Sequence, residues 1–161
     1  MGIRICPDYN LKCIYDIDLD ELKSRGIKVI MFDLDSTLMI SKSGMLLDET
    51  RDWLGKVRED FEVVVISNNY SEEYLGKARA VCDFRVIGAA RKPDPTVMQS
   101  YLDEIGVEPC CAVMVGDRPL TDILGGKRLG CTTILVDSIN AENENLPTRF
   151  VRWLERLTIK K

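Results

Sequence analysis

Two aspartates follow the first apolar segment of this sequence at a spacing that suits phosphoryl transfer. Asp33 and Asp35 come directly after the apolar residues 27–32 and are followed by Ser36-Thr37. On an extended strand, side chains two residues apart lie on the same side, about 6–7 Å from each other. One carboxylate could then attack phosphorus, while the other donates a proton and later accepts one. The pair therefore predicts catalysis by an aspartate nucleophile.

Polar groups that can handle phosphate also follow three later apolar segments. Residues 63–66 end in Ser67-Asn68-Asn69, residues 84–87 lead to Arg91-Lys92, and residues 112–115 end in Gly116-Asp117, with Asp122 five residues further on. Ligands of an open α/β sheet bind beyond the carboxyl ends of its strands. We therefore expect these groups to meet at one edge of a sheet.

Four carboxylates at one sheet edge would repel each other and raise one another's pKa values. They belong to Asp33, Asp35, Asp117 and Asp122. A divalent cation together with Lys92 would reduce their formal charge from −4 to −1. Oxygen ligands without histidine or cysteine favour Mg²⁺. The chain contains no histidine at all, which excludes Ser–His and Cys–His mechanisms and a mixed zinc site.

Each of these polar groups also has a structural alternative. Asp33 and Asp35 could cap a turn at a strand end, and Ser67 could do the same. Lys92 could lie in a solvated loop, and Asp122 could simply favour the N-terminal dipole of a following helix.

Short apolar segments rich in Val and Ile must position these groups. They read as strands buried on both faces of a parallel sheet, at residues 27–32, 63–66, 84–87, 112–115 and 132–136. Helix signals lie between them, starting at Asp18, Asp48, Ser71, Asp94-Pro95 and Pro119, and a last helix is expected over residues 148–159. The alternation predicts an α/β, doubly wound, mostly parallel five-stranded sheet.

The length of the chain fits a single domain spanning residues 1–161. About 25 residues separate Thr37 from Val63, and one helix fills most of them. We therefore expect no separate cap domain, and an open site that accepts a bulky substrate or one embedded in a surface.

Composition restricts the partners and the compartment. The net charge of −4 argues against a dominant role in binding nucleic acid, which requires a basic face. The six cysteines form no C-x-x-C pair, and the sequence has neither a signal-peptide core nor a run of 18 apolar residues. We expect a cytoplasmic protein with free thiols.

The polar groups resemble, in order, the four motifs of the haloacid dehalogenase (HAD) superfamily: Asp33-Leu34-Asp35-Ser36-Thr37, Ser67, Lys92, and Gly116-Asp117 with Asp122. The resemblance implies that Asp33 is the nucleophile and a Mg²⁺ ligand. It implies that Asp35 is the general acid/base, with its backbone carbonyl on the metal. Asp117 would ligate Mg²⁺ directly, and Asp122 would support the metal shell. Ser67, its neighbour Asn68 and Lys92 would bind the phosphoryl group of the substrate.

The resemblance extends along the chain to the bacterial YqeG family, which is related to mitochondrial phosphatidylglycerophosphate phosphatases. It rests on Pro7-Asp8, Ile14-Tyr15-Asp16-Ile17, Gly26-Ile27-Lys28, Lys92-Pro93, Thr121-Asp122-Ile123-Leu124-Gly125-Gly126 and Thr148-Arg149-Phe150. It implies a Mg²⁺-dependent phosphate monoester hydrolase, whose substrate could be phosphatidylglycerophosphate. The alternatives are a soluble metabolite or phosphoprotein as substrate, or a binding module that has lost turnover.

The sequence departs from the family pattern at two places. Ser36 stands where asparagine is usual, which we expect to be harmless. Arg118-Pro119 replaces glutamine and an apolar residue, which bears on the rim of the site and on substrate preference.

The C-terminal segment, residues 148–161, combines an apolar stripe with basic residues. Phe150, Val151, Trp153, Leu154 and Leu157 fall close to helical spacing. Five basic residues against one glutamate, Glu155, give the segment a charge of +4. The stripe could pack on the sheet with the arginines in water. Alternatively, the basic face could rest on anionic lipid and make the protein peripheral to a membrane.

Overall fold

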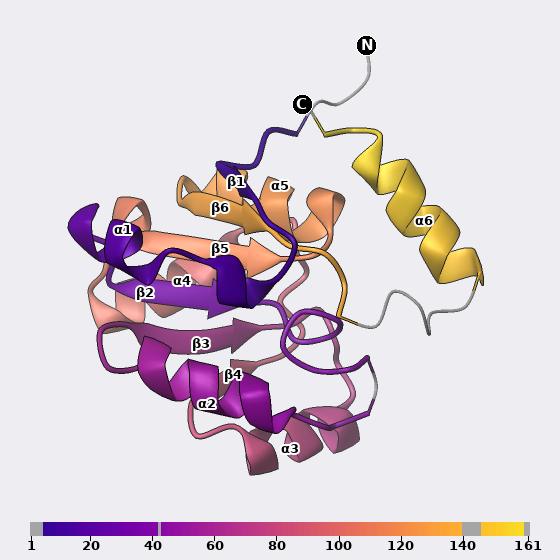
Figure 1. The fold of residues 1–161 in the computed structure, drawn as a ribbon, viewed down its shortest axis with the longest axis horizontal. Coiled ribbons are helices and arrows are strands. Elements are labelled where there is room, and N and C mark those ends of the chain that lie inside the picture. The colour runs from indigo at the N-terminus through magenta and orange to yellow at the C-terminus, as the bar shows by residue number, and fades with distance from the viewer. Residues whose placement is uncertain (1–4, 42, 140–145, 160–161) are drawn as a thin grey trace.

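The computed structural model describes residues 5–41, 43–139 and 146–159. In this part of the chain six strands form one sheet in the order β1-β6-β5-β2-β3-β4, and all paired strands are parallel (Figure 1). The strands are β1 (Tyr9–Asn10), β2 (Val29–Phe32), β3 (Glu62–Ile66), β4 (Arg85–Ile87), β5 (Ala112–Gly116) and β6 (Thr132–Leu135). The predicted fold class is confirmed, with one strand more than expected.

The additional strand, β1, gives almost no signal in the sequence. It has two residues, Tyr9 and Asn10, which pair with Ile134 and Leu135 of β6 at the edge of the sheet. A strand this short cannot show the apolar run or the alternation by which strands are recognised.

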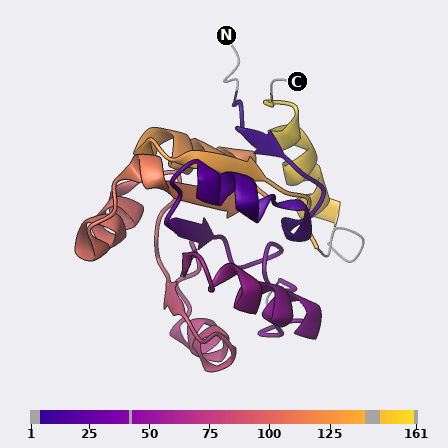
Figure 2. The ribbon, with the colours of Figure 1, turned by 60° about the vertical axis from the view of Figure 1, so that its left-hand side comes forward.

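Helices cover both faces of the sheet, which explains why its central strands are apolar at every position. The helices are α1 (Leu19–Ser24), α2 (Asp48–Val57), α3 (Glu72–Val81), α4 (Thr96–Ile105), α5 (Leu124–Leu129) and α6 (Leu146–Arg156). Ile30 and Phe32 of β2 point into one core cluster with residues of α1, α2 and α3. Val29 and Met31 point into the other, with residues of α4 and α5. The two layers can be followed in Figures 1 and 2.

Side-chain caps start two of the helices as the sequence predicted. Asp18 accepts a hydrogen bond from the backbone N–H of Glu21 (3.0 Å), and Ser71 accepts one from that of Tyr74 (3.3 Å). Each cap satisfies an N–H group that the first turn of a helix leaves without a partner.

Three other helix starts differ from the prediction. α2 begins at Asp48 itself, which is thus a first-turn residue rather than the cap. α4 begins at Thr96, whose N–H donates to the Asp94 side chain, so Pro95 precedes the helix. The segment from Pro119 is first a π-helical turn, Pro119–Ile123, and becomes α-helical only at Leu124.

The order of the strands places a topological switch point between β2 and β5. From β2 the chain moves outward through β3 and β4, then returns to the other side of β2 with β5 and β6. Phe32 of β2 is in register with Val115 of β5, and the Asp33 N–H donates to the Val115 carbonyl (2.9 Å). Ligands of such sheets bind at this crevice, outside the carboxyl ends of the strands.

The carboxyl edge of the sheet carries no cap domain in the part of the chain that the structure describes. Between β2 and β3 lie a loop and α2 alone. α6 lies beyond this edge, on the side to which the strand arrows point (Figure 1). Among the described residues, no helix is long and apolar enough to span a bilayer.

The orientation of α6 contradicts the interpretation in which its apolar stripe packs on the sheet. Phe150, Val151, Trp153, Leu154 and Leu157 are all exposed, between 43% and 64%. The rings of Phe150 and Trp153 stack on each other, with centroids 5.9 Å apart.

Polar side chains, rather than the apolar stripe, attach α6 to the rest of the protein. The Glu155 side chain is buried and accepts hydrogen bonds from the guanidinium of Arg118 (2.9 and 3.2 Å). Arg156 pairs with Asp137 (3.1 Å) and donates to the Val136 carbonyl (2.9 Å). Of the predicted basic face, Arg156 is therefore directed at the protein. The side chains of Arg149 and Arg152, and residues Lys160 and Lys161, lie outside the described part.

Candidate active site

A buried lysine lies at the centre of the site. Nζ of Lys92 donates to Oδ1 of Asp33 (2.8 Å) and to Oδ1 of Asp122 (2.7 Å), and its side chain is almost completely buried. Burial alone would lower the pKa of Lys92, but the adjacent carboxylates of Asp122 and Asp33 hold that pKa above its usual value. The lysine is therefore charged and fixed at the carboxyl edge, and is not in a solvated loop.

Three buried carboxylates cluster around this lysine. Asp33, Asp117 and Asp122 each direct one carboxylate oxygen to a common region, and these oxygens lie within 4.8 Å of one another. With Lys92 present, the three carboxylates keep a formal charge of −2. Hard oxygen donors and an excess of negative charge fit Mg²⁺, which needs no nitrogen or sulfur ligand. The donor set therefore suits the metal that the sequence predicts.

Asp122 reaches the cluster because Gly116 leaves room for it. A Cβ atom at Gly116 would lie 2.2 Å from Oδ2 of Asp122. That same oxygen accepts the backbone N–H of Arg118 (3.1 Å). Burial, and then repulsion by Asp33, raises the pKa of Asp122 to about 6, against the opposing influence of Lys92. The Asp122 carboxylate thus faces the buried cluster and not the solvent at a helix end.

The loop after β2 supports the cluster from the side of the nucleophile. The hydroxyl of Thr37 donates to Oδ1 of Asp117 (3.1 Å), which joins the first and fourth motifs directly. Ser36, which directly precedes Thr37, has a φ of 65°, in the left-handed region. Its carbonyl accepts a hydrogen bond from the N–H of Ile139. Asparagine adopts this conformation more readily than serine. The departure from the family pattern at Ser36 therefore falls on a position with a backbone constraint.

Asn68 and Ser67 lie close to the lysine, but their observed contacts are within the protein. The Asn68 amide donates to the Lys92 carbonyl (2.9 Å) and accepts the Lys92 N–H (2.6 Å). Oγ of Ser67 is buried and accepts the N–H of Asn69 (3.1 Å). Asn68 thus positions the backbone of Lys92. Substrate contact by Ser67 and Asn68 stays a prediction.

Asp35 is half-buried beside the cluster and has a partner that sequence reasoning missed. The hydroxyl of Tyr74, in the first turn of α3, donates to Oδ1 of Asp35 (2.5 Å). Tyr74 belongs to no motif, and its position three residues after a cap gives no indication of this contact. Arg91 is exposed, and the Arg118 side chain is directed at Glu155.

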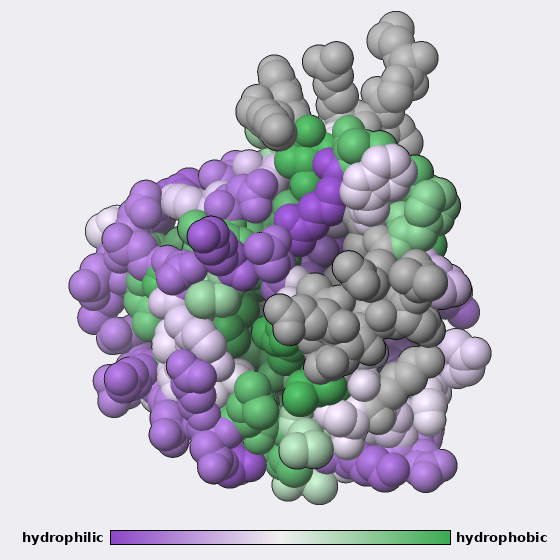
Figure 3. Space-filling model, turned by 45° about the vertical axis from the view of Figure 1, so that its right-hand side comes forward, coloured by the Kyte–Doolittle hydropathy of each residue, from purple (hydrophilic) through white to green (hydrophobic). Residues whose placement is uncertain are grey.

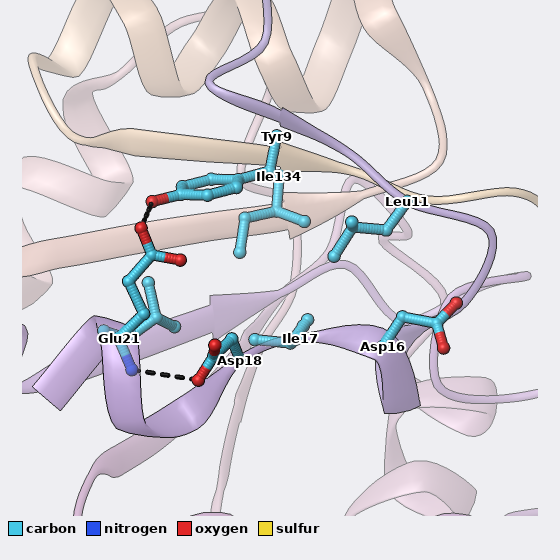
Figure 4. Close-up of a pocket in the computed structure, with 8 residues that line it drawn as sticks. Tyr9, Leu11, Asp16, Ile17, Asp18, Glu21 and Ile134 are labelled. Carbon is cyan, nitrogen blue, oxygen red and sulfur yellow. Dashed lines mark hydrogen bonds between the residues drawn. The ribbon is translucent and has the colours of Figure 1, made fainter.

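A cavity lies away from these residues, between β1, β6 and α1 (Figure 4). It has a volume of about 130 Å³ and is lined by Tyr9, Leu11, Asp16, Ile17, Asp18, Glu21, Leu22 and Ile134. Polar groups on its wall pair with each other, since Tyr9 donates to the Glu21 carboxylate (2.9 Å) and Asp18 caps α1. None of the predicted site residues contributes to this cavity.

Comparison with known proteins points to the same chemistry. A family model described as HAD-hydrolase-like matches residues 89–152. The chain is 32% identical to the probable phosphatase YqeG of Bacillus subtilis, over 93% of this chain and 87% of that protein. It is 30% identical to phosphatidylglycerophosphate phosphatase 1 of Arabidopsis thaliana, over 98% of this chain. The chain spans about half, 48%, of the length of that plant protein.

A solved structure agrees with the fold. A HAD family enzyme from Bacteroides thetaiotaomicron, in complex with magnesium and inorganic phosphate, superposes with a TM-score of 0.54 at 15% identity. The match covers 78% of this chain and all of that one. That enzyme was crystallised with Mg²⁺ and phosphate, and the buried aspartate cluster of this chain could bind a metal ion. The chain belongs to the YqeG-like family of HAD-superfamily phosphatases.

Proposed function

We propose that this phosphatase is a Mg²⁺-dependent phosphate monoester hydrolase that works through a phosphoaspartate on Asp33. An Asp33 oxygen attacks phosphorus and the ester P–O bond breaks, while Asp35 gives its proton to the leaving oxygen. Asp35 then takes a proton from a water molecule whose oxygen attacks the same phosphorus. The P–O bond to Asp33 breaks, and inorganic phosphate leaves.

Asp33 contacts the buried ammonium group of Lys92 and belongs to the carboxylate cluster. This arrangement supports the proposal most directly. Lys92 would hold the phosphoryl oxygens next to the nucleophile, since its Nζ lies 2.8 Å from Oδ1 of Asp33. Asp33, Asp117 and Asp122, with the Asp35 carbonyl, would hold Mg²⁺. When bound, this ion would offset the negative charge of the carboxylates and of the phosphoryl group.

Trapping the intermediate tests the mechanism. Asp35→Asn should still be phosphorylated by p-nitrophenyl phosphate, because nitrophenolate leaves without a proton, and should hydrolyse the phosphoenzyme slowly. Mass spectrometry should find one phosphoryl group on Asp33, and none in the Asp33→Asn/Asp35→Asn double variant. A wild-type protein without Mg²⁺-dependent hydrolysis of any phosphate monoester would instead support the binding-module alternative.

The exposed apolar surface supports a substrate held in a lipid surface. In the part of the chain that the structure describes, nine large hydrophobic side chains are exposed: Met45, Leu47, Tyr70, Ile139, Phe150, Val151, Trp153, Leu154 and Leu157. Four lie on α6 and Leu157 directly follows it, while the other four lie in loops that follow β2, β3 and β6, at the end of the sheet that carries Asp33. Figure 3 shows apolar residues gathered near the upper edge of the molecule, where α6 lies.

This apolar rim, meaning the nine residues just named, belongs to the same end of the sheet as the uncapped site. Exposed apolar surface that gathers in one region marks contact with membranes or partners. We infer that the rim rests on an anionic membrane and that the substrate is a phosphorylated lipid head group, as the name of the plant relative suggests. The +4 charge of residues 148–161 complements anionic lipid, at about 1 kcal/mol for each basic residue near the surface.

Vesicle binding tests the membrane contact apart from the chemistry. The protein should sediment with phosphatidylglycerol vesicles at low salt, and a Phe150→Gln/Trp153→Gln variant should bind at least tenfold more weakly. Hydrolysis of p-nitrophenyl phosphate should be unchanged in this variant, whereas hydrolysis of phosphatidylglycerophosphate in vesicles should fall. Self-association of the wild type without vesicle binding would assign the rim to a second copy. Equal activity of the variant on vesicles would favour a soluble metabolite or a phosphoprotein as substrate.

A further inference from the structure

Tyr74 connects the hydrophobic core to the carboxylate that handles the proton. Its hydroxyl donates to Oδ1 of Asp35 at 2.5 Å, although the two residues are 39 positions apart in the sequence. The ring is 9% exposed and belongs to the core cluster under α2 and α3. Most buried tyrosines find a hydrogen-bond partner, and here that partner is the carboxylate proposed as the general acid.

Both ends of Tyr74 are fixed. Its backbone N–H donates to the capping Ser71, at the start of α3, and its ring packs in the core next to Leu75 and Ala78. A tyrosine side chain has only two rotatable torsions, so holding the ring also fixes the hydroxyl. The hydrogen bond to Asp35 therefore comes from a rigid part of the protein.

The role proposed for Asp35 makes the orientation of its side chain critical. Asp35 is only half-buried, and its side chain must present a proton to an oxygen that changes with every substrate. A misplaced proton donor loses much of its effect, because proton transfer requires hydrogen-bond distance.

We propose that Tyr74 is a positioning residue for the proton transfers of this enzyme, a proposal that rests on the proposed function of Asp35. The phenol holds Oδ1, so that Oδ2 carries the proton to the leaving oxygen and later receives one from water. Tyr74 makes no bond to phosphorus and exchanges no proton itself. Its removal affects the reaction only through the orientation of Asp35.

The dependence of the rate on the leaving group tests this role. A nitrophenolate leaves without a proton, whereas an alkoxide needs one, so only alkyl phosphates depend on the acid. Tyr74→Phe keeps the ring and should lower kcat/KM for glycerol 3-phosphate about tenfold or more, with less than a threefold change for p-nitrophenyl phosphate. Tyr101→Phe, which removes the hydroxyl of a similarly buried tyrosine in the other core cluster, should change neither value.

A second variant separates positioning from a general structural effect. In an Asp35→Asn background, Tyr74→Phe should cause no further selective loss on the alkyl phosphate, because residues that act as a unit are non-additive. An equal loss on both substrates, no loss on either, or an undiminished effect in the Asp35→Asn background would overturn the proposal. Inactivity of the wild type on both substrates would instead reject the proposed function itself.

Discussion

Replacing Lys92 by methionine should destabilise the protein strongly, even though Lys92 is a candidate active-site residue. The substitution keeps an unbranched side chain of similar length and removes only the cation. It leaves Asp33 and Asp122, which Lys92 contacts at 2.8 and 2.7 Å, close to each other without a counter-charge. Replacing a functional residue often stabilises a protein. Replacing Lys92 should not, because it leaves two buried carboxylates without their cation.

The magnitude follows from burial and from protonation. Removing one partner of a buried ion pair typically costs about 3–5 kcal/mol. Asp122 limits the cost, because it can take up a proton. At pH 7, protonating a carboxyl whose usual pKa is 3.8 costs about 4 kcal/mol, at about 1.36 kcal/mol for each pH unit. We therefore expect a loss of about 3–5 kcal/mol, or about 6–20 °C in Tm for a domain of this size.

Urea unfolding without Mg²⁺ measures this loss, and Lys23→Met is the matched control. Lys23 forms an ion pair of the same length with Asp60 (2.8 Å), but both side chains are exposed, so its removal should cost much less than that of Lys92. Because protonation of Asp122 relieves the repulsion, the deficit of Lys92→Met should shrink as the pH falls from 8 to 6. A deficit equal to that of Lys23→Met, or one that grows towards pH 6, would refute the reasoning.

Four further outcomes follow from the site and the core. Chelation of Mg²⁺ should stop hydrolysis, and Asp117→Ala should raise the Mg²⁺ concentration for half-maximal rate at least tenfold; full activity in excess EDTA would contradict the metal site. Ser36→Asn should stabilise the protein by about 0.5–1 kcal/mol in thermal unfolding, because it relieves a left-handed serine, whereas Ser43→Asn should not. Burial raises the pKa of Cys82 to about 11 and of Cys131 to about 12, so at pH 9 a thiol reagent should label exposed Cys6 long before either. The same shifts mean that the folded protein holds these two protons more tightly than the unfolded chain, so the free energy of unfolding should fall as the pH rises above 9.

The sequence predicted the parts of the fold that repeat a strong pattern. Five strands appear as nearly continuous apolar runs because helices cover both faces of the sheet. The residues at their carboxyl ends could be grouped because parallel strands place those ends at one edge. The contacts of Lys92 with Asp33 and Asp122 follow from this topology.

The remainder depends on tertiary contacts that no local pattern records. Tyr74 is a core residue by every sequence criterion, and only the packing of α3 directs its hydroxyl to Asp35. The stripe on α6 has the spacing of a buried face, yet Glu155 is the residue that is buried, because Arg118 lies opposite it. A helical period shows that one face differs from the other, but it does not show which face meets the protein.

The pairing of β2 with β5 has a consequence for folding kinetics. It brings together Asp33 and Asp117, which are 84 residues apart, so the candidate metal site cannot form before a long loop has closed. Such non-local pairing is slow to form, and early states of the chain would hold the aspartates apart. If the folding transition state precedes this pairing, Mg²⁺ should leave the folding limb of the chevron unchanged and slow the unfolding limb. The ion would then lengthen the lifetime of the folded chain without shortening the time it needs to fold.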